Sequence, residues 1–248
     1  MGLVFDFTES KAYEKWAHQF KSRLDTELEF NLMRQLLKPA TGESVIDIGC
    51  GIGHSLMHLL NAGLQVTGLD PSPYMLDISQ SVVGNRVDLY RGFAEDLPFD
   101  DNSFNHASIF TTLEFVDNPR KALAEAFRVA KDRVFLGVLN RYAIQGANRR
   151  ATSPSIEAVY EKARFFSIWE LKGLIRDLGG AMPVRWRTIC QFPNTSGKFA
   201  SSFERSRIVQ RCPFGSFAGM VITLVPRVRT RPLALRYSPK QSPGELYG

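Results

Sequence analysis

The segment 45–53 constrains the fold more than any other part of the chain. It reads VIDIGCGIG, a short β-branched run followed by glycine at every second position. β-Branched residues favour a strand, and closely spaced glycines permit a sharp turn in which a ligand can touch the main chain. A helical pattern follows at 52–60, so the sequence predicts a strand, a glycine turn and a helix in succession.

The alternation of strand and helix continues along the rest of the chain. Short apolar runs typical of strands lie at 44–48, 64–69, 87–90, 104–110, 133–139, 184–190 and 217–225. Helical patterns lie at 10–37, 52–60, 72–83, 119–130 and 167–179, the last opened by the capping-box sequence SIWE. Strands that alternate with helices form a parallel sheet with helices on both faces. The last two strands lack a helix between them, so we predict an α/β fold with a seven-stranded, mostly parallel sheet and an antiparallel last strand.

Two aspartates accompany the glycine turn. Asp47 precedes Gly49 by two residues, and Asp70 ends the next predicted strand. An acid at that strand end can accept both hydroxyls of a ribose. The dinucleotide fingerprint G-x-G-x-x-G requires a glycine where this chain has His54, so NAD and NADP are not expected as ligands. The carboxylate of Asp47 would repel a pyrophosphate and suits a ligand that carries an ammonium group.

Four motifs in order make the chain similar to a known family. They are DIGCGIG at 47–53, GLDPSPYM at 68–75, AEDLPF at 94–99 and SFNHA at 103–107. With them, the region from 40 to 140 resembles the class I S-adenosylmethionine-dependent methyltransferases, most closely the branch with the ubiquinone and menaquinone C-methyltransferases. The resemblance implies a Rossmann-like fold and an enzyme that uses S-adenosyl-L-methionine. It also implies methyl transfer to a small-molecule acceptor, which we expect to be apolar or anionic.

The resemblance also implies which residues bind the cofactor. Asp47 would lie near its ammonium group, Asp70 would take the ribose hydroxyls, and Met75 would lie against the adenine. The chain departs from the family at two positions. It has Phe93 where the family usually has Asp or Asn, and Asn105 where the family usually has Asp. The full set of implied cofactor-binding residues is Asp47, Gly49, Gly51, Asp70, Met75, Phe93, Ala94, Glu95 and Thr111.

The acceptor side of the site is predicted from fewer signals. Methyl transfer from a sulfonium is an in-line displacement, so positioning and the exclusion of water matter more than acidic groups near sulfur. Glu114 follows the fourth strand and is the candidate catalytic base or acceptor-orienting group. The candidate acceptor-binding residues are aromatic: Tyr13 and Trp16 in the first helix, and Phe199 and Phe203 in the segment 193–215.

Metal sites, disulfides and membrane spans are not expected. His54 and His58 lie four residues apart, a spacing found in metal pairs, but no third ligand is apparent. The three cysteines are too few and too scattered for a disulfide framework. No apolar stretch approaches the roughly 20 residues of a membrane span, and the first ten residues lack a signal-peptide pattern. We therefore expect a cytoplasmic protein.

The net charge of +6 is concentrated near the end of the chain. Residues 201–240 hold eight basic residues and one acid, whereas residues 1–200 are balanced. This excess leaves open a solvated tail, an anionic membrane surface as partner, or nucleic acid as partner in an RNA methyltransferase. A protein that binds the cofactor without catalysis is the remaining alternative. The sequence does not indicate an oligomeric state.

The predicted domain organisation has three parts. Residues 1–40 would form an N-terminal helical cap, and residues 41–226 the methyltransferase domain. Within that domain, the insert 193–215 would act as an acceptor lid. The prolines and basic residues of 227–248 predict an extended or disordered tail.

Overall fold

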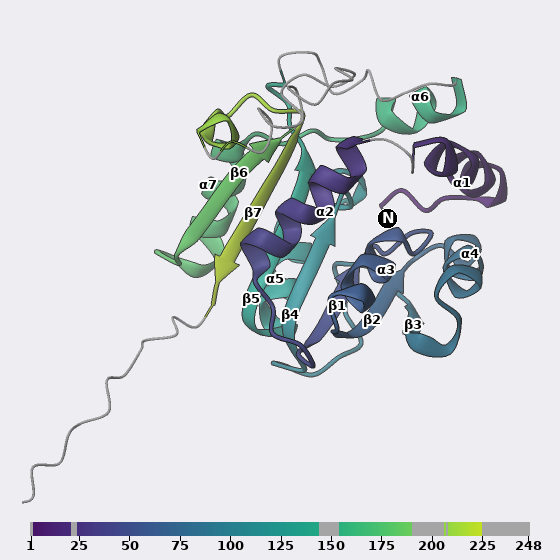
Figure 1. Ribbon diagram of the computed structural model, residues 1–248, viewed down its shortest axis with the longest axis horizontal. Helices are drawn as coiled ribbons and strands as arrows, with labels where there is room; N and C mark the ends of the chain where they lie inside the picture. The colour runs from purple at the N-terminus through teal and green to yellow at the C-terminus, as the bar shows by residue number, and fades with distance from the viewer. Residues whose placement is uncertain (1, 21–23, 144–153, 190–205, 207, 225–248) are drawn as a thin grey trace, which may run out of the picture.

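A seven-stranded sheet lies at the centre of the computed structural model (Figure 1), which describes residues 2–20, 24–143, 154–189, 206 and 208–224. The strand order is β3-β2-β1-β4-β5-β7-β6. β7 pairs antiparallel with both of its neighbours, and the other pairs are parallel, which confirms the predicted fold class. The strands are β1 (Ser44–Ile48), β2 (Gln65–Asp70), β3 (Asp88–Arg91), β4 (Phe104–Phe110), β5 (Ala130–Leu139), β6 (Val184–Ile189) and β7 (Phe217–Thr223).

Helices cover both faces of the sheet. α2, α3 and α4 pack on one face, α5 and α7 pack on the other, and α1 and α6 lie beyond the carboxyl ends of the parallel strands (Figure 1). The α-helices are α1 (Phe7–Phe20), α2 (Leu24–Leu37), α3 (His54–Asn61), α4 (Pro73–Val83), α5 (Pro119–Val129), α6 (Pro154–Glu161) and α7 (Ile168–Gly179). Short 3-10 helices are η1 (Gly84–Arg86), η2 (Leu113–Phe115) and η4 (Val209–Arg211).

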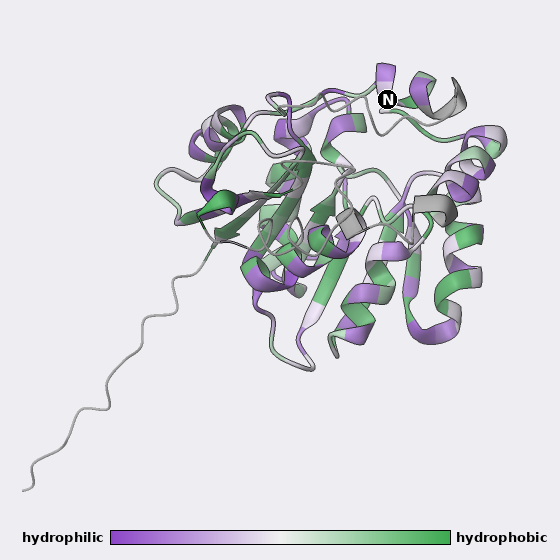
Figure 2. Cartoon of the chain, turned by 45° about the horizontal axis from the view of Figure 1, so that its top comes forward, coloured by the Kyte–Doolittle hydropathy of each residue, from purple (hydrophilic) through white to green (hydrophobic). Residues whose placement is uncertain are grey.

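The core has two layers because side chains alternate along each strand. Val45 and Phe135 pack in the cluster that includes α2 and α3, whereas Ile46 and Leu136 pack in the cluster that includes α5 and α7. Figure 2 shows that the central strands are hydrophobic and that the surrounding helices are amphipathic.

The helix predicted over 10–37 is two helices in the structure, because its two halves pack against different partners. α1 contacts α4 and α6 beside the carboxyl edge of the sheet. α2 lies on the sheet and contributes Leu32, Met33 and Leu36 to the core. The second half of the predicted N-terminal cap is therefore part of the central core, and the first half lies near the site described below.

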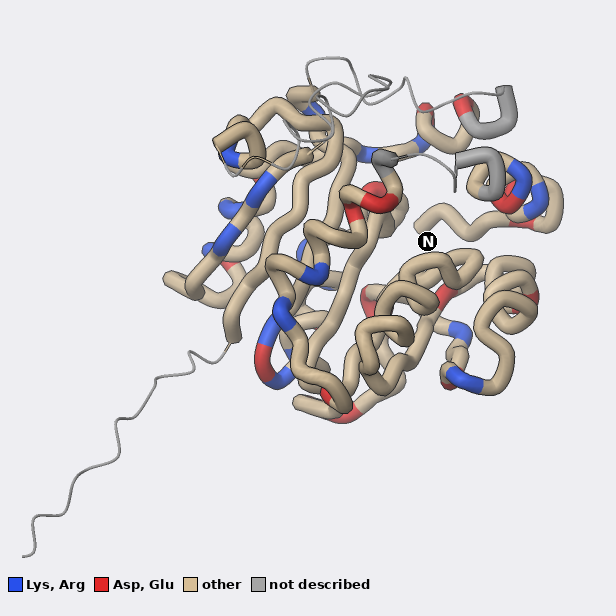
Figure 3. Tube along the Cα trace, in the orientation of Figure 1, with Lys and Arg blue, Asp and Glu red and all other residues tan. Residues whose placement is uncertain are grey.

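Arginines from the sheet stabilise the carboxyl end of α2. Arg133 Nη1 donates to the carbonyl oxygens of Leu37 (2.6 Å) and Lys38 (3.2 Å), and Arg185 Nη2 donates to that of Leu36 (3.2 Å). The last carbonyls of a helix lack intrahelical partners and carry a partial negative charge. Figure 3 shows basic positions along β6, beside this helix end. The charges at these two arginines thus have a structural role.

Two helices, α4 and α7, begin at capping serines, at the positions where the sequence predicts a helix start. The hydroxyl of Ser72 accepts from the backbone N–H of Met75 at the start of α4. Ser167 and Glu170 form the predicted capping box at the start of α7. Such caps satisfy otherwise unpaired N–H groups and fix where the loops at the carboxyl edge end.

Candidate cofactor site

The glycine turn between β1 and α3 is held in left-handed backbone conformations. Gly49, Gly51 and Gly53 have φ angles of 76°, 52° and 85°. The N–H of Gly49 donates to the carbonyl of Leu69 at 2.7 Å, which ties the turn to the end of β2. A Cβ at Gly49 would collide with the side chain of Thr112, whereas a Cβ at Gly51 would find no atom within 4 Å. Gly49 is therefore required for packing, and Gly51 borders open space.

Asp70 lies at the end of β2 and fixes the geometry of the turn. Its Oδ2 accepts from the N–H of Gly51 and its Oδ1 from the N–H of Ser72, both at 2.9 Å. Burial raises the pKa of the carboxyl to about 6, and these backbone hydrogen bonds oppose the rise. A carboxylate has about four acceptor positions, so two remain for ligand hydroxyls.

Asp47 is buried behind the glycine turn and does not line the cavity. Its Oδ2 accepts a hydrogen bond from the hydroxyl of Ser55. Burial raises the pKa of this carboxyl to about 6, with the Ser55 hydrogen bond acting in the opposite direction. A cation bound in front of the turn would favour the charged form of Asp47.

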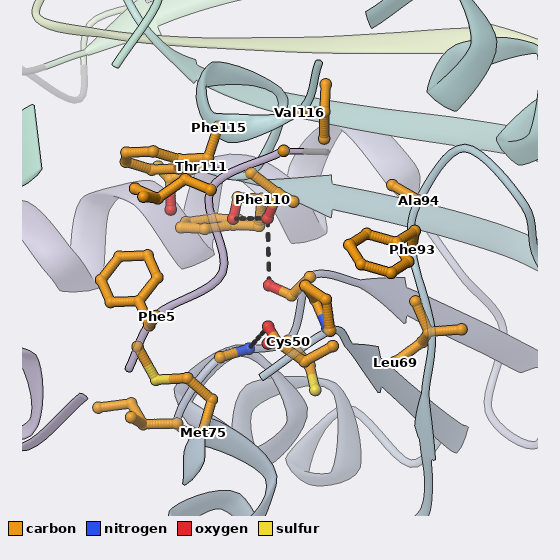
Figure 4. Close-up of a pocket in the computed structure, with 18 of the residues that line it drawn as sticks. Phe5, Cys50, Leu69, Met75, Phe93, Ala94, Phe110, Thr111, Phe115 and Val116 are labelled. Carbon is orange, nitrogen blue, oxygen red and sulfur yellow. Dashed lines mark hydrogen bonds between the residues drawn. The ribbon is translucent and has the colours of Figure 1, made fainter. Parts of the chain in front are cut away.

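A cavity of about 920 Å³, partly open to solvent, lies in front of the turn. Figure 4 shows Met75 and Phe5 on one side and Leu69, Phe93 and Ala94 on the other. Phe110, Thr111, Phe115 and Val116 lie across from the turn. The residues predicted from the sequence that line the cavity are Tyr13, Gly49, Gly51, Asp70, Met75, Phe93, Ala94, Glu95 and Thr111.

The N-terminal segment 2–6 forms one wall of the cavity, which sequence reasoning did not predict. The N–H of Leu3 donates to the carbonyl of Phe115 at 2.9 Å, and the hydroxyl of Ser72 donates to the carbonyl of Phe5 at 2.6 Å. The ring of Phe5 meets those of Tyr13 and Phe115 edge-on, with centroids 5.7 and 6.0 Å away. The run LVF at 3–5 was the only sequence signal for this placement.

Thr111 has an unusual backbone at the end of β4. Its φ is 48°, a left-handed value that costs a β-branched residue energy. Its N–H donates to the carbonyl of Gly137 at 2.7 Å, which helps to hold this conformation. Strain of this kind concentrates at binding and catalytic sites, and Thr111 lines the cavity.

A second cavity, of about 600 Å³, adjoins the first. The two share Tyr13, His54, Phe110 and Thr111 as lining residues. The residues that line only the second are Trp16, Ala17, Thr26, Glu29, Phe30 and Tyr160. Trp16 was predicted as an acceptor-binding residue, whereas Glu29, Phe30 and Tyr160 were not, because only the folded chain brings α2 and α6 to this position.

Glu114, like Asp47, is not among the described residues that line either cavity. Glu114 is buried at 2 % exposure, and its Oε1 accepts from the N–H of Leu139 at 2.6 Å. This placement favours a structural role over that of a base. Phe199 and Phe203, with most of the segment 193–215, lie outside the described residues.

The departure at Asn105 lies away from the cavities. Its Oδ1 accepts from the N–H of Ser44 at 3.1 Å, near the amino end of β4, and its Nδ2 donates to Asp132 at 3.2 Å. The departure at Phe93, in contrast, lines the first cavity.

Among the described residues, no cluster of three or more His, Cys, Asp or Glu side chains is arranged to hold a metal ion. Of the helices described, none is both long and apolar enough to cross a membrane. The ring of His58 stacks on Phe30 with centroids 3.8 Å apart, and His54 lines the first cavity.

Comparison with known proteins supports the assignment of the fold. Residues 46–137 match the family described as "Methyltransferase domain". An uncharacterized methyltransferase of Mycobacterium tuberculosis is 36% identical over 103 residues, which cover 42% of each chain. The demethylmenaquinone methyltransferase of Clavibacter sepedonicus is 38% identical over 95 residues, 38% of this chain and 39% of that one. The matches thus span about two fifths of these relatives.

A solved structure shows the same fold over most of the chain. An S-adenosylmethionine-dependent methyltransferase from Thermotoga maritima superimposes with a TM-score of 0.60 and 23% identity, and covers 88% of this chain and 99% of its own. With this fold and glycine turn, residues 46–137 match a methyltransferase domain, and the chain is similar to the class I S-adenosylmethionine-dependent methyltransferases.

The residues of the first cavity fit the cofactor of this class, S-adenosyl-L-methionine. Open space lies in front of Gly51, and Asp70 retains acceptor positions at the end of β2. The buried carboxylate of Asp47 lies behind the place where a cationic group would bind. The sequence-based expectation about class, fold and cofactor is confirmed.

Proposed function

We propose that the protein transfers the methyl group of S-adenosyl-L-methionine to a small-molecule acceptor. The observation that carries this proposal is the pair of adjoining cavities at the carboxyl edge of the sheet. One cavity has the residues that suit the cofactor, and the other opens beside Thr111 and Tyr13. The junction between them is where a methyl group and an acceptor atom would meet.

Binding of the cofactor is assigned to residues of the first cavity. Asp70 would accept from the ribose hydroxyls, and the main chain at Gly49 and Gly51 would hold the methionyl part. Met75 would pack on one face of the adenine, while 93–95 would line its edge. The charge of Asp47 would stabilise the ammonium group through the turn, at a distance that a buried site does not screen strongly.

In this proposal, catalysis comes mainly from the alignment of the two reactants and from the exclusion of water. The bound cofactor supplies an electrophilic methyl group. Phe5, Phe110 and Phe115 line the first cavity with apolar surface that would displace water once the cofactor is bound, and the strained Thr111 lies at the junction. Holding two reactants in line at such a junction removes much of the entropic barrier of a bimolecular step.

The experiment uses deuterium-labelled S-adenosyl-L-methionine, the full chain and pooled small-molecule extracts, with mass detection of labelled products and of S-adenosylhomocysteine. Asp70→Asn tests the site, and Asp88→Asn is the matched control, because Asp88 is an exposed aspartate at the start of β3. The wild type and the control should form labelled product. Asp70→Asn should bind the cofactor about tenfold more weakly or worse, from the loss of hydrogen bonds to a charged group.

Cofactor binding without labelled product from any pool would favour a non-catalytic S-adenosylmethionine-binding protein. Labelled RNA, formed only when RNA is added, would favour the RNA methyltransferase. Equal cofactor affinity for Asp70→Asn and the control would remove the proposed site.

A further inference from the structure

The second cavity has a composition that bears on the acceptor, and the inference drawn from it rests on the proposed function. Half of the residues that line it are Phe, Tyr or Trp: Tyr13 and Trp16 from α1, Phe30 from α2, Phe110 from β4 and Tyr160 from α6. These side chains come from four elements, of which β4 and α6 are far from α1 and α2 in sequence. Their convergence on one cavity beside the predicted methyl position makes it the natural acceptor site.

The aromatic rings of this wall contact one another. The centroids of Tyr13 and Trp16 are 5.2 Å apart, and those of Trp16 and Tyr160 are 6.2 Å apart in an edge-on arrangement. On the other side, Phe30 stacks on Phe110 at 4.7 Å. Aromatic faces attract cations, most strongly where water is excluded, and they also pack against flat apolar groups.

The charged group of this cavity is Glu29. It lies on α2 with 6 % of its surface exposed and lines the cavity among the aromatic rings. Figure 3 shows the acidic positions of α2 in its half nearest the carboxyl edge of the sheet. The described residues that line the two cavities include Asp70, Glu95 and Glu29 but neither Lys nor Arg. A carboxylate or phosphate would be repelled there, and an organic cation attracted.

We infer that the acceptor is an amine that carries an aromatic or apolar group, with Glu29 binding its ammonium form. The ammonium loses one proton to the imidazole of His54, which lines both cavities. The nitrogen lone pair then forms a bond to the methyl carbon while the carbon–sulfur bond breaks and its electron pair stays on sulfur. The positive charge passes from sulfur to nitrogen, towards Glu29.

Because of this transfer of charge, Glu29 would stabilise the transition state more than the bound reactants. Acidic groups near sulfur would stabilise the bound cofactor more than the transition state. Glu29 instead lines only the acceptor cavity, where positive charge develops as the new bond forms. A preorganised carboxylate at that place stabilises the transition state. An oxygen acceptor, which attacks as an anion, would gain nothing from it.

The test measures binding of two probes to the full chain, with and without saturating S-adenosylhomocysteine. The probes are 2-phenylethylamine, a cation, and 3-phenylpropanoate, an anion of similar size. The variant is Glu29→Gln, and the matched control is Glu27→Gln, an exposed glutamate two residues earlier on the same helix. We expect the amine to bind the wild type and the control alike, and Glu29→Gln about tenfold more weakly or worse. Binding of the anion should be weak in the wild type and no weaker in Glu29→Gln.

Tighter binding of 3-phenylpropanoate than of the amine by the wild type, or equal amine affinity in Glu29→Gln and wild type, would overturn the inference. If Glu29→Gln loses its fold, Trp16→Leu replaces it and should weaken the amine several-fold more than the anion. Equal losses for both probes would then refute the assignment. Failure of S-adenosylhomocysteine to bind the wild type would refute the proposed function instead. In that case, the titrations without S-adenosylhomocysteine still show whether the cavity binds the amine or the anion more tightly.

Discussion

The replacement of Gly51 by alanine tests the cofactor site with little disturbance of the fold. Gly51 has a φ of 52° and lines the first cavity, and a Cβ placed there would meet no atom within 4 Å. The added methyl group would therefore project into space that the ligand needs. Gly42 offers a matched control, because its φ is 85° and a Cβ there would also meet nothing within 4 Å. Gly42 precedes β1, at the opposite end of the strand from the cavity.

The two variants should lose similar amounts of stability. A left-handed conformation costs a residue with a Cβ about 1–2 kcal/mol. For a chain of this size, each kcal/mol lowers the melting temperature by about 2–4 °C, so both variants should melt about 2–8 °C below the wild type. Neither incurs a steric clash in the ligand-free protein.

Their affinities for S-adenosyl-L-methionine should differ. Forcing a methyl group into an occupied, close-packed site costs about 1–3 kcal/mol. A cost of 1.4 kcal/mol is a factor of ten, so Gly51→Ala should bind about 5- to 150-fold more weakly, while Gly42→Ala should match the wild type. Calorimetric titration gives these affinities, and thermal melting gives the stabilities.

The reasoning would be refuted if both variants lost affinity to the same extent, because the effect would then follow stability and not position. Full affinity in Gly51→Ala would mean that the cofactor does not bind against the turn. A much larger loss of stability in Gly51→Ala than in Gly42→Ala would mean that the space in front of Gly51 is filled by protein.

Two further predictions concern buried carboxyl groups. Because the pKa of Asp47 is raised from 3.8 to about 6 in the folded state, its charge lowers the free energy of unfolding progressively as the pH rises from about 4 through 6. Asp47→Asn should therefore raise the free energy of unfolding at pH 7 by up to about 3 kcal/mol while weakening cofactor binding, and a less stable variant at pH 7 would contradict this. Glu114→Ala should lower the free energy of unfolding by about 1–3 kcal/mol, since it leaves the N–H of Leu139 without its acceptor. Denaturant titration measures both, and an unchanged stability with lost methyl transfer would return Glu114 to the role of a base.

The fold and the cofactor side of the site were predictable because their signals are local in sequence. The glycine turn at 49–53 follows directly on β1, and Asp70 ends β2. Their approach in space follows from the rule that parallel strands bring their carboxyl ends to one edge. Met75 and 93–95 lie in short loops or first turns after neighbouring strands, so the same rule places them.

The acceptor side was not predictable in the same way. Glu29 and Tyr160 reach the second cavity only because α2 packs on the sheet and α6 packs against α1. No pattern within either helix shows this. Glu114 follows β4 in sequence, but the 3-10 turn at Leu113–Phe115 directs its carboxylate to the backbone of Leu139 and not into a cavity. Side-chain direction within one short turn is set by tertiary contacts.

A crystal structure of the full chain with bound S-adenosylhomocysteine tests the cofactor site most directly. We predict that the adenine lies between Met75 and the segment 93–95, and that the ribose hydroxyls donate to Asp70. The homocysteine part should lie against Gly49 and Gly51, with its sulfur facing the second cavity. A ligand bound elsewhere, or a ribose that does not contact Asp70, would contradict the assignment of this cavity as the methyl-donor site.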